Sequence, residues 1–153
     1  MEVLMTSQQI KNIENSAFAD GVAVELLMDR AGSALAEEVE KAVENRTHEN
    51  LLVLCGKGNN GGDGFVAADK LTGFFKTVYV YMPFGLPKTR RRANAFEKMN
   101  KAVKITEDLA ILKDCDTVID RLFGFSFHGG VNRQTGEIIR AVNRSGAFVI
   151  SAD

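Results

Sequence analysis

The sequence predicts a single α/β domain, in which helices cover a mainly parallel β-sheet and two further helices precede it. After about residue 46, short apolar runs of strand length alternate with helix-like patterns. One such run, residues 51–55, leads directly into a glycine-rich turn and then into a helix-like segment. A chain of 153 residues is also long enough for one domain with a substantial core and short for two.

The N-terminal part predicts the two preceding helices. Thr6 can cap the first helix, and Gln9 three residues later completes a capping box. The second helix is expected over residues 22–43, because its apolar residues fall near helical spacing. These residues are Leu26, Leu27, Leu35, Val39 and Val43.

The remaining chain predicts alternating strands and helices. Strands are expected at residues 51–55, 77–82, 117–122 and 147–152, with a short extra strand near 103–105. Helices are expected at 64–73, 88–101, 108–113 and 135–144. This alternation favours parallel strands joined by right-handed crossovers, in which ligands bind at the carboxyl ends of the strands.

Composition excludes several classes of protein. The formal net charge is −1, so no overall field attracts nucleic acid or an anionic membrane. No apolar stretch reaches the roughly 20 residues of a membrane span, and the N-terminus lacks the pattern of a signal or transit peptide. Cys55 and Cys115 are expected to be buried free thiols of a reducing compartment. We therefore expect a cytoplasmic protein, with mitochondria as the eukaryotic alternative.

The glycine-rich turn carries the strongest signal in the chain. Its glycines at 56, 58, 61, 62 and 64 allow backbone N–H groups to approach a phosphate, and the helix that follows adds its dipole. The adjacent Asn59, Asn60 and Asp63 add side-chain oxygens at the same place. The segment therefore predicts a specialised nucleotide pocket, with a purely structural turn as the alternative.

The acidic residue of ordinary NAD-binding folds is missing. Such folds carry Asp or Glu about 20 residues after the glycine turn, where it binds the ribose hydroxyls. Here that region reads Val-Tyr-Val-Tyr-Met-Pro over residues 78–83. An NAD-dependent dehydrogenase and a methyltransferase are therefore both disfavoured.

Polar groups also follow two later strands. Asp120 would repel a nearby phosphate unless a cation intervened, and its oxygens suit an alkali or alkaline-earth ion better than zinc; the alternative is a turn or cap residue. Asp153 stands where an inward-facing catalytic carboxylate would lie. Between them, the loop 124–130 could hold a heterocycle and a phosphate, although Phe125 and Phe127 could equally be core residues.

Two basic features remain ambiguous. His128 could be a general acid or base, but a lone loop histidine is more often exposed and inert. The basic run at residues 88–92 is best interpreted as a solvated helix face, with contact to a ligand phosphate or to RNA as the alternatives. Few aromatic residues accompany it, so nucleic acid is an improbable partner.

Three segments together resemble the NAD(P)H-hydrate epimerase family, also called the YjeF N-terminal domain. They are residues 56–64 (Gly-Lys-Gly-Asn-Asn-Gly-Gly-Asp-Gly), 118–127 and 149–153, and the helical segment 28–32 also looks like the family's pre-sheet helix. The resemblance covers essentially residues 1–153 as one domain. It implies a Rossmann-like, three-layer α/β/α fold and a complete domain that continues past Asp153.

The resemblance also implies roles for individual residues. Asp153 would be the acidic catalytic residue at the reacting ring, and Asn60 and Asp120 would bind one K⁺ per subunit. The family usually has a small residue where this chain has Arg121, Glu-Asn where it has Asp29-Arg30, and a potassium-binding serine after Asp153. Contacts to the hydrated dinucleotide are implied for Asn59, Asn60, Gly61, Gly62, Asp63, Gly124, Phe125, Ser126, Phe127, His128, Gly129, Gly130 and Asp153.

The implied activity is repair of damaged nicotinamide nucleotides. Family members interconvert the R and S epimers of hydrated NADH and NADPH, so that a companion dehydratase specific for the S epimer can restore the cofactor. Many are homodimers. The rival interpretation is a non-catalytic YjeF-type module that dimerises or binds a protein or RNA partner. The joint presence of Asn60, Asp63, Asp120 and Asp153 favours the enzyme.

Overall fold

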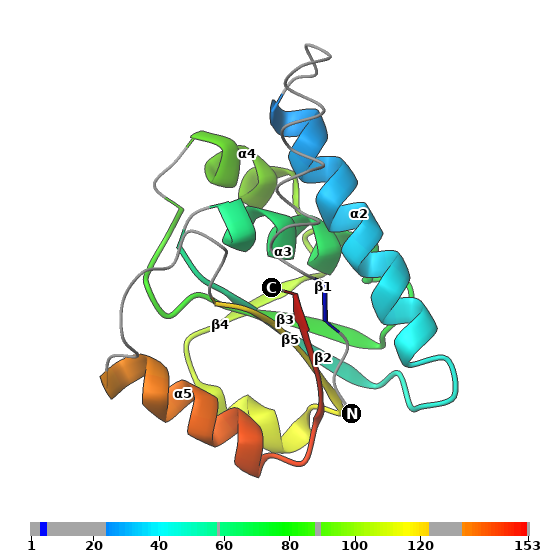
Figure 1. Ribbon diagram of the computed structural model, residues 1–153, viewed down its shortest axis with the longest axis vertical. Helices are drawn as coiled ribbons and strands as arrows, with labels where there is room; N and C mark the ends of the chain where they lie inside the picture. The colour runs from blue at the N-terminus through cyan, green and yellow to red at the C-terminus, as the bar shows by residue number, and fades with distance from the viewer. Residues whose placement is uncertain (1–3, 6–23, 58, 88–89, 123–132, 153) are drawn as a thin grey trace.

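Six parallel strands form one sheet in the computed structural model, which describes residues 4–5, 24–57, 59–87, 90–122 and 133–152 (Figure 1). Along the sheet, the order is β1-β6-β5-β2-β3-β4. The chain therefore builds outward from β2 through β3 to β4, and then returns to build outward on the other side through β5 and β6. The direction reverses between β2 and β5, and ligands bind at such a switch point. The strands span Leu4–Met5 (β1), Asn50–Cys55 (β2), Thr77–Tyr81 (β3), Lys104–Thr106 (β4), Thr117–Arg121 (β5) and Phe148–Ala152 (β6).

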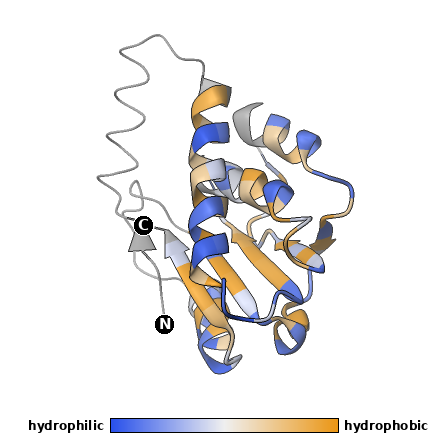
Figure 2. Ribbon diagram, turned by 90° about the vertical axis from the view of Figure 1, so that its right-hand side faces the viewer, coloured by the Kyte–Doolittle hydropathy of each residue, from blue (hydrophilic) through white to orange (hydrophobic). Residues whose placement is uncertain are grey.

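Helices cover both faces of the sheet. On one face lie α2 (Val24–Ala42), α3 (Asn59–Lys70) and α4 (Arg90–Lys98); on the other lie the 3₁₀ helix η1 (Leu109–Asp114) and α5 (Arg133–Arg144) (Figure 1). Each face has its own apolar core, in which Val39 and Phe65 belong to the first cluster and Leu112 and Ile138 to the second. The strands between them are largely hydrophobic (Figure 2), as expected for a parallel sheet buried on both faces.

Most of the predicted elements are present. The four main strands, the short extra strand and the second N-terminal helix lie within a few residues of their expected bounds. The segment expected as a helix at 108–113 is the 3₁₀ helix η1, whose first turn is capped by the Asp108 carboxylate accepting from Ala110 N at 2.9 Å. The edge strand β1 was not predicted, and the first N-terminal helix falls outside the described residues.

The start of α3 differs from the prediction. We expected a helix at 64–73 after a glycine-rich loop, whereas α3 begins at Asn59 and includes the glycines in its first turns. The reason is packing against the sheet: a Cβ on Gly64 would lie 2.8 Å from Cys55 Sγ on β2. On the outer side of α3, a Cβ on Gly32 of α2 would overlap Val66. The glycines therefore let α3 fit closely between α2 and the sheet.

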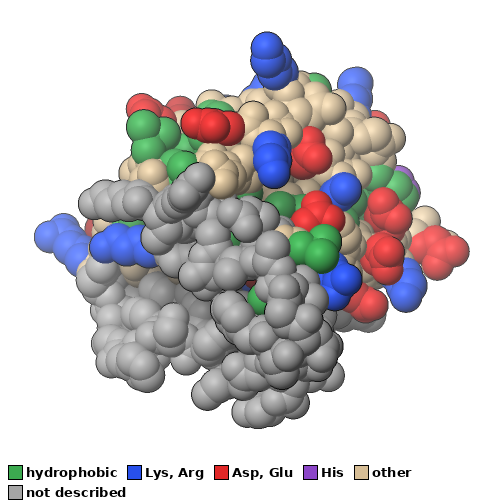
Figure 3. All heavy atoms as spheres, turned by 90° about the horizontal axis from the view of Figure 1, so that it is seen from above, with side chains coloured by type: hydrophobic (Ala, Val, Ile, Leu, Met, Phe, Trp, Pro, Cys, Tyr) green, Lys and Arg blue, Asp and Glu red, His purple; other side chains and the backbone are tan. Residues whose placement is uncertain are grey.

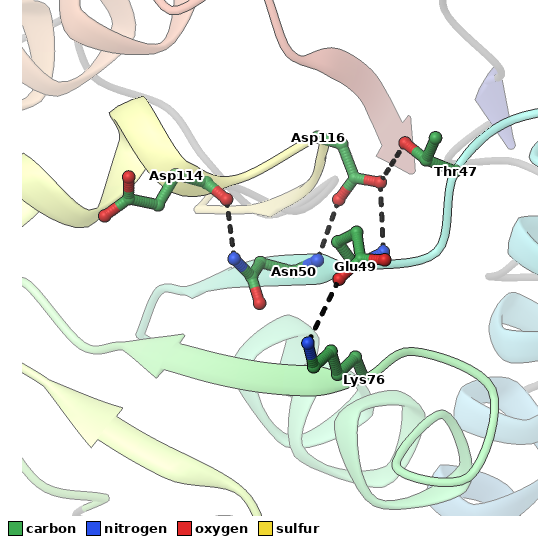
Figure 4. Close-up of polar contacts among 6 residues, drawn as sticks. All are labelled: Thr47, Glu49, Asn50, Lys76, Asp114 and Asp116. Atoms are coloured by element: carbon green, nitrogen blue, oxygen red, sulfur yellow. Dashed lines mark hydrogen bonds and ion pairs between the residues drawn. The ribbon is translucent and has the colours of Figure 1, made fainter.

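At the amino-terminal edge of the sheet, Asp116 fastens β5 to β2 (Figure 4). Its carboxylate accepts hydrogen bonds from Thr47 Oγ1 at 2.6 Å, from Glu49 N at 3.2 Å and from Asn50 N at 2.9 Å. The Asn50 side chain in turn donates to the Asp114 carbonyl at 2.7 Å. These bonds hold the segment before β5 against the start of β2, at the edge opposite the switch point.

One face of the molecule carries charged side chains of both signs. On the face in Figure 3, acidic and basic side chains are interspersed over the described residues and form no patch of a single sign. In the part of the chain that the structure describes, no helix is long and apolar enough to cross a bilayer.

We expect Asp116→Ala to lower the free energy of unfolding by about 2–3 kcal/mol, because it leaves two backbone N–H groups and the Thr47 hydroxyl without their acceptor. Urea denaturation followed by circular dichroism measures this loss. Glu107→Ala, at an exposed position, is the control and should change stability by no more than about 0.5 kcal/mol. A loss for Asp116→Ala no larger than that of the control would show that the network contributes nothing.

Candidate functional site

Three strand ends meet at the carboxyl edge, as the sequence predicted. β5 lies between β2 and β6, with Cys55 opposite Arg121 and Asp120 opposite Ser151. The switch point between β2 and β5 thus brings together the glycine-rich segment and the segment that contains Asp120. The polar residues of both segments occupy the place where α/β sheets bind ligands.

Gly56 allows β2 and β5 to stay close beyond their last paired residues. Its N–H donates to the Arg121 carbonyl at 2.9 Å, and a Cβ at this position would overlap the Leu122 carbonyl. Any other residue would force these two strand ends apart. Gly56 therefore determines how closely the ends of β2 and β5 approach each other beside the candidate site.

A buried ion pair joins α3 to β5. Arg121 Nη2 lies 2.8 Å from Asp63 Oδ2, and the two side chains are only 2% and 6% exposed. Buried charges of this kind persist only when they are well paired, because desolvation of each is costly. The Asp63 carboxylate, expected to contact the ligand, is thus engaged by Arg121 beneath the first turns of α3.

Asp120 lies on the opposite face of β5 from Arg121. Side chains alternate along a strand. Ile119 belongs to the core cluster on the α3 side and Val118 to the cluster on the α5 side, so Arg121 faces α3 and Asp120 faces α5. Asp120 is half-buried, and its Oδ1 accepts from Leu122 N at 3.0 Å. The guanidinium of Arg121 and the carboxylate of Asp120 therefore belong to different sides of the sheet.

Asp120 has the chemistry expected of a cation ligand. Carboxylate oxygens at the switch point are hard donors of the kind that alkali and alkaline-earth ions prefer. Among the described residues, no cluster of three His, Cys, Asp or Glu could hold a metal ion by itself.

Several predicted site residues lie outside what the structure describes. They are the loop 124–130, which includes Phe125, Ser126, Phe127 and His128, and the terminal Asp153. Asn59 and Asn60 are placed in the first turn of α3, whereas their side chains are not described. Gly61 and Gly62 are buried in the same turn. Their roles remain predictions.

A group of residues on the Asp120 side of the sheet was not predicted from the sequence. Lys57 is exposed, and its Nζ lies 5.1 Å from the ring centroid of Phe84, which follows β3 and packs on the core cluster on the α5 side. Gln134 Nε2 at the start of α5 donates to the Pro83 carbonyl at 3.1 Å. Lys57 lies inside the glycine-rich motif, and a positive charge at that position could have marked it as a candidate ligand contact.

The two cysteines are buried, and Cys115 is unsuited to act as a nucleophile. Cys55 and Cys115 are both buried thiols outside any disulfide, as predicted. Burial, followed by the negative charges of Asp116 and Asp114, raises the pKa of the Cys115 thiol from 9.0 to about 12. The thiol therefore stays protonated well above neutral pH, where a reactive cysteine would have to be a thiolate.

The motifs at this edge agree with a comparison to known families. The family described as YjeF-related protein N-terminus matches residues 24–153 of the chain. The chain belongs to the YjeF_N family. The Rossmann-like α/β architecture described above is therefore the fold expected of this family.

Curated relatives carry names that bear on activity. The NAD(P)H-hydrate epimerase of Plasmodium knowlesi is 35% identical over 158 residues, covering 100% of this YjeF_N chain and 55% of that protein. The bifunctional NAD(P)H-hydrate repair enzyme Nnr of Archaeoglobus fulgidus is 32% identical over 151 residues, covering 97% of this chain and 31% of that protein. The chain thus spans about half the length of the Plasmodium relative.

A solved structure supports the same fold. The crystal structure of yeast YNL200c superposes with a TM-score of 0.78 at 23% sequence identity, covering 97% of this YjeF_N chain and 68% of the yeast chain. At this level of identity, the similarity establishes the architecture of the sheet and its helices.

We expect Asp63 and Arg121 to be strongly coupled in a double-mutant cycle. Asp63→Ala or Arg121→Met alone leaves a buried charge without its partner and should cost about 3–5 kcal/mol of unfolding free energy. The double variant leaves neither charge and should lose at least about 2 kcal/mol less than the sum of the single losses. Equilibrium urea unfolding provides all four stabilities.

The exposed Arg133–Glu137 pair is the matched control for this cycle. Arg133 Nε lies 3.4 Å from Glu137 Oε1, and the two side chains are 93% and 60% exposed. Its coupling should be no more than about 0.5 kcal/mol. Equal coupling in the two pairs would contradict the importance assigned to the buried one.

Proposed function

We propose that this YjeF_N domain is an isomerase, an NAD(P)H-hydrate epimerase that interconverts the R and S epimers of hydrated NADH and NADPH. One observation carries the proposal: the first turn of α3 and the half-buried Asp120 meet at the switch point of the sheet, where a dinucleotide would bind. Family membership and relatives named as epimerases support it.

The dinucleotide would be bound by the glycine-rich segment and the loop 124–130. The first turn of α3 offers unpaired backbone N–H groups and the positive end of the helix dipole to the pyrophosphate. Asn59, Asn60, Gly61 and Gly62 would contact the ligand there. We assign Asp63 a positioning role, because its carboxylate is paired with Arg121 and fixes this turn against β5.

Asp153 would provide the acid–base group. In the hydrated ring, the nitrogen lone pair can expel hydroxide from C6 to give an iminium ion, and water can add back to either face. A carboxyl group at this position would protonate the departing hydroxide and later accept a proton from the attacking water. Such a group typically accelerates a reaction by about 10²–10⁴-fold.

A monovalent cation fits beside this site. The Asp120 carboxylate and the Asn60 amide would hold K⁺, which would offset the negative charge of the pyrophosphate. We also propose that the domain acts as a homodimer and that its S epimer is consumed by an NAD(P)H-hydrate dehydratase. The name of the bifunctional Nnr relative, a repair enzyme for the same hydrates, is consistent with such a link.

The decisive experiment is epimerisation of purified R-NADPH hydrate, followed by chromatography. The wild-type chain should produce the S epimer, and Asp153→Asn should reduce kcat by about 10²–10⁴-fold while nucleotide binding persists. Asp114→Asn, at an exposed position of the opposite edge, is the control and should leave turnover unchanged. A folded wild-type chain that binds nucleotide or a macromolecular partner without any conversion would favour the rival binding module.

We expect Asp120→Asn to change the response to cations. In wild type, the rate should be higher in potassium than in sodium buffer, because the site selects by ion size and ligand number. The variant loses one negative ligand and should need roughly tenfold more K⁺ for half-maximal rate. An unchanged potassium dependence would remove Asp120 from the cation site.

A further inference from the structure

The segment at the end of β3 has no acidic residue, and the proposed function gives this segment no role. In dinucleotide-binding sheets, the adenosine ribose lies at the end of the strand beside the glycine-bearing strand, where an acid binds the 2′-hydroxyl of NAD and a cation accommodates the 2′-phosphate of NADP. Here β3 is that neighbour, paired with β2 from Asn50 opposite Thr77 to Leu54 opposite Tyr81. The sequence contains no Asp or Glu between Asp69 and Glu97.

A lysine occupies the position next to this strand end. Lys57 is exposed and follows β2 by two residues, and its ammonium lies 5.1 Å from the centroid of the Phe84 ring, three residues after the end of β3. None of the ion pairs among the described residues involves Lys57. Its ammonium therefore lies beside the segment that follows β3, and no ion pair with a described residue engages its charge.

The ring and its loop are held in place. Phe84 is half-buried against the core cluster on the α5 side, and the preceding Pro83 carbonyl accepts from Gln134 Nε2 at 3.1 Å. A cation over an aromatic face is attracted to it and loses part of its freedom. Contact with the Phe84 ring therefore restricts the position of the Lys57 ammonium.

We propose that Lys57 recognises the 2′-phosphate of the ligand, so that the domain prefers NADPH hydrate to NADH hydrate. This inference rests on the proposed function and names the substrate form that it selects. The 2′-phosphate would meet the Lys57 ammonium, and neither β3 nor the segment 82–87 that follows it carries a carboxylate to accept from a 2′-hydroxyl. Glu107 and Asp108 follow the neighbouring strand β4, and the Asp108 carboxylate accepts from Ala110 N there.

The test compares the two hydrates with wild type, Lys57→Met and Lys57→Arg. Wild type should show a higher kcat/KM with NADPH hydrate, and Lys57→Met should reduce the NADPH-to-NADH ratio of kcat/KM by roughly 10- to 100-fold. Lys57→Arg keeps the charge and should retain most of the preference. The matched control is Lys76→Met, an exposed lysine at the opposite edge that lies 3.7 Å from Glu49; it should leave the ratio unchanged. A ratio unaffected by Lys57→Met would overturn the proposal.

Binding of 2′,5′-ADP and 5′-AMP by calorimetry separates this inference from the proposed reaction. Wild type should bind 2′,5′-ADP more tightly, and Lys57→Met should remove most of that difference. Equal affinities in wild type, or no binding of either, would overturn the role of Lys57. A Lys57-dependent preference for 2′,5′-ADP in a chain that epimerises neither hydrate would retain the recognition of the 2′-phosphate and reject the epimerase.

Discussion

The buried pair between Asp63 and Arg121 is the interaction on which the geometry of the site depends. It places two full charges between α3 and β5, where water cannot solvate them, so the helix and the strand end must stay close. Two glycines leave room for this packing: a Cβ on Gly56 would overlap the Leu122 carbonyl, and a Cβ on Gly64 of α3 would lie 2.8 Å from Cys55 Sγ on β2. The Asp63–Arg121 pair and the small size of Gly56 and Gly64 together keep the first turns of α3 close to the end of β5.

Side chains alternate along β5, so Arg121 and Asp120 lie on opposite faces of the sheet. Arg121 serves the packed interior beneath α3, and Asp120 on the other face remains half-buried near the start of α5. Arg121 is paired with Asp63 on one face of β5, and Asp120 lies on the other face at the carboxyl edge.

The strands of the sheet could be predicted from the sequence, because apolar runs such as 51–55 and 117–122 have strand length and are bounded by glycine or polar residues. The site residues at the carboxyl edge remain predictions. The start of α3 was placed too late, since glycines usually indicate a loop and the demand for close packing on Cys55 is a tertiary effect. The two-residue β1 has no detectable pattern of its own. The Asp63–Arg121 pair joins positions 58 residues apart, and no periodicity connects them.

The pairing of β1 with β6 also constrains how the domain folds. Leu4 lies opposite Ser151, so this contact closes a single loop that contains all the other strands described. The entropic cost of closing a loop increases with the length of the loop, and contacts between residues far apart in the sequence form slowly. During synthesis, β1 must wait without its partner until β6 has left the ribosome. Because it is only two residues long, it exposes little unpaired backbone to other chains in that interval.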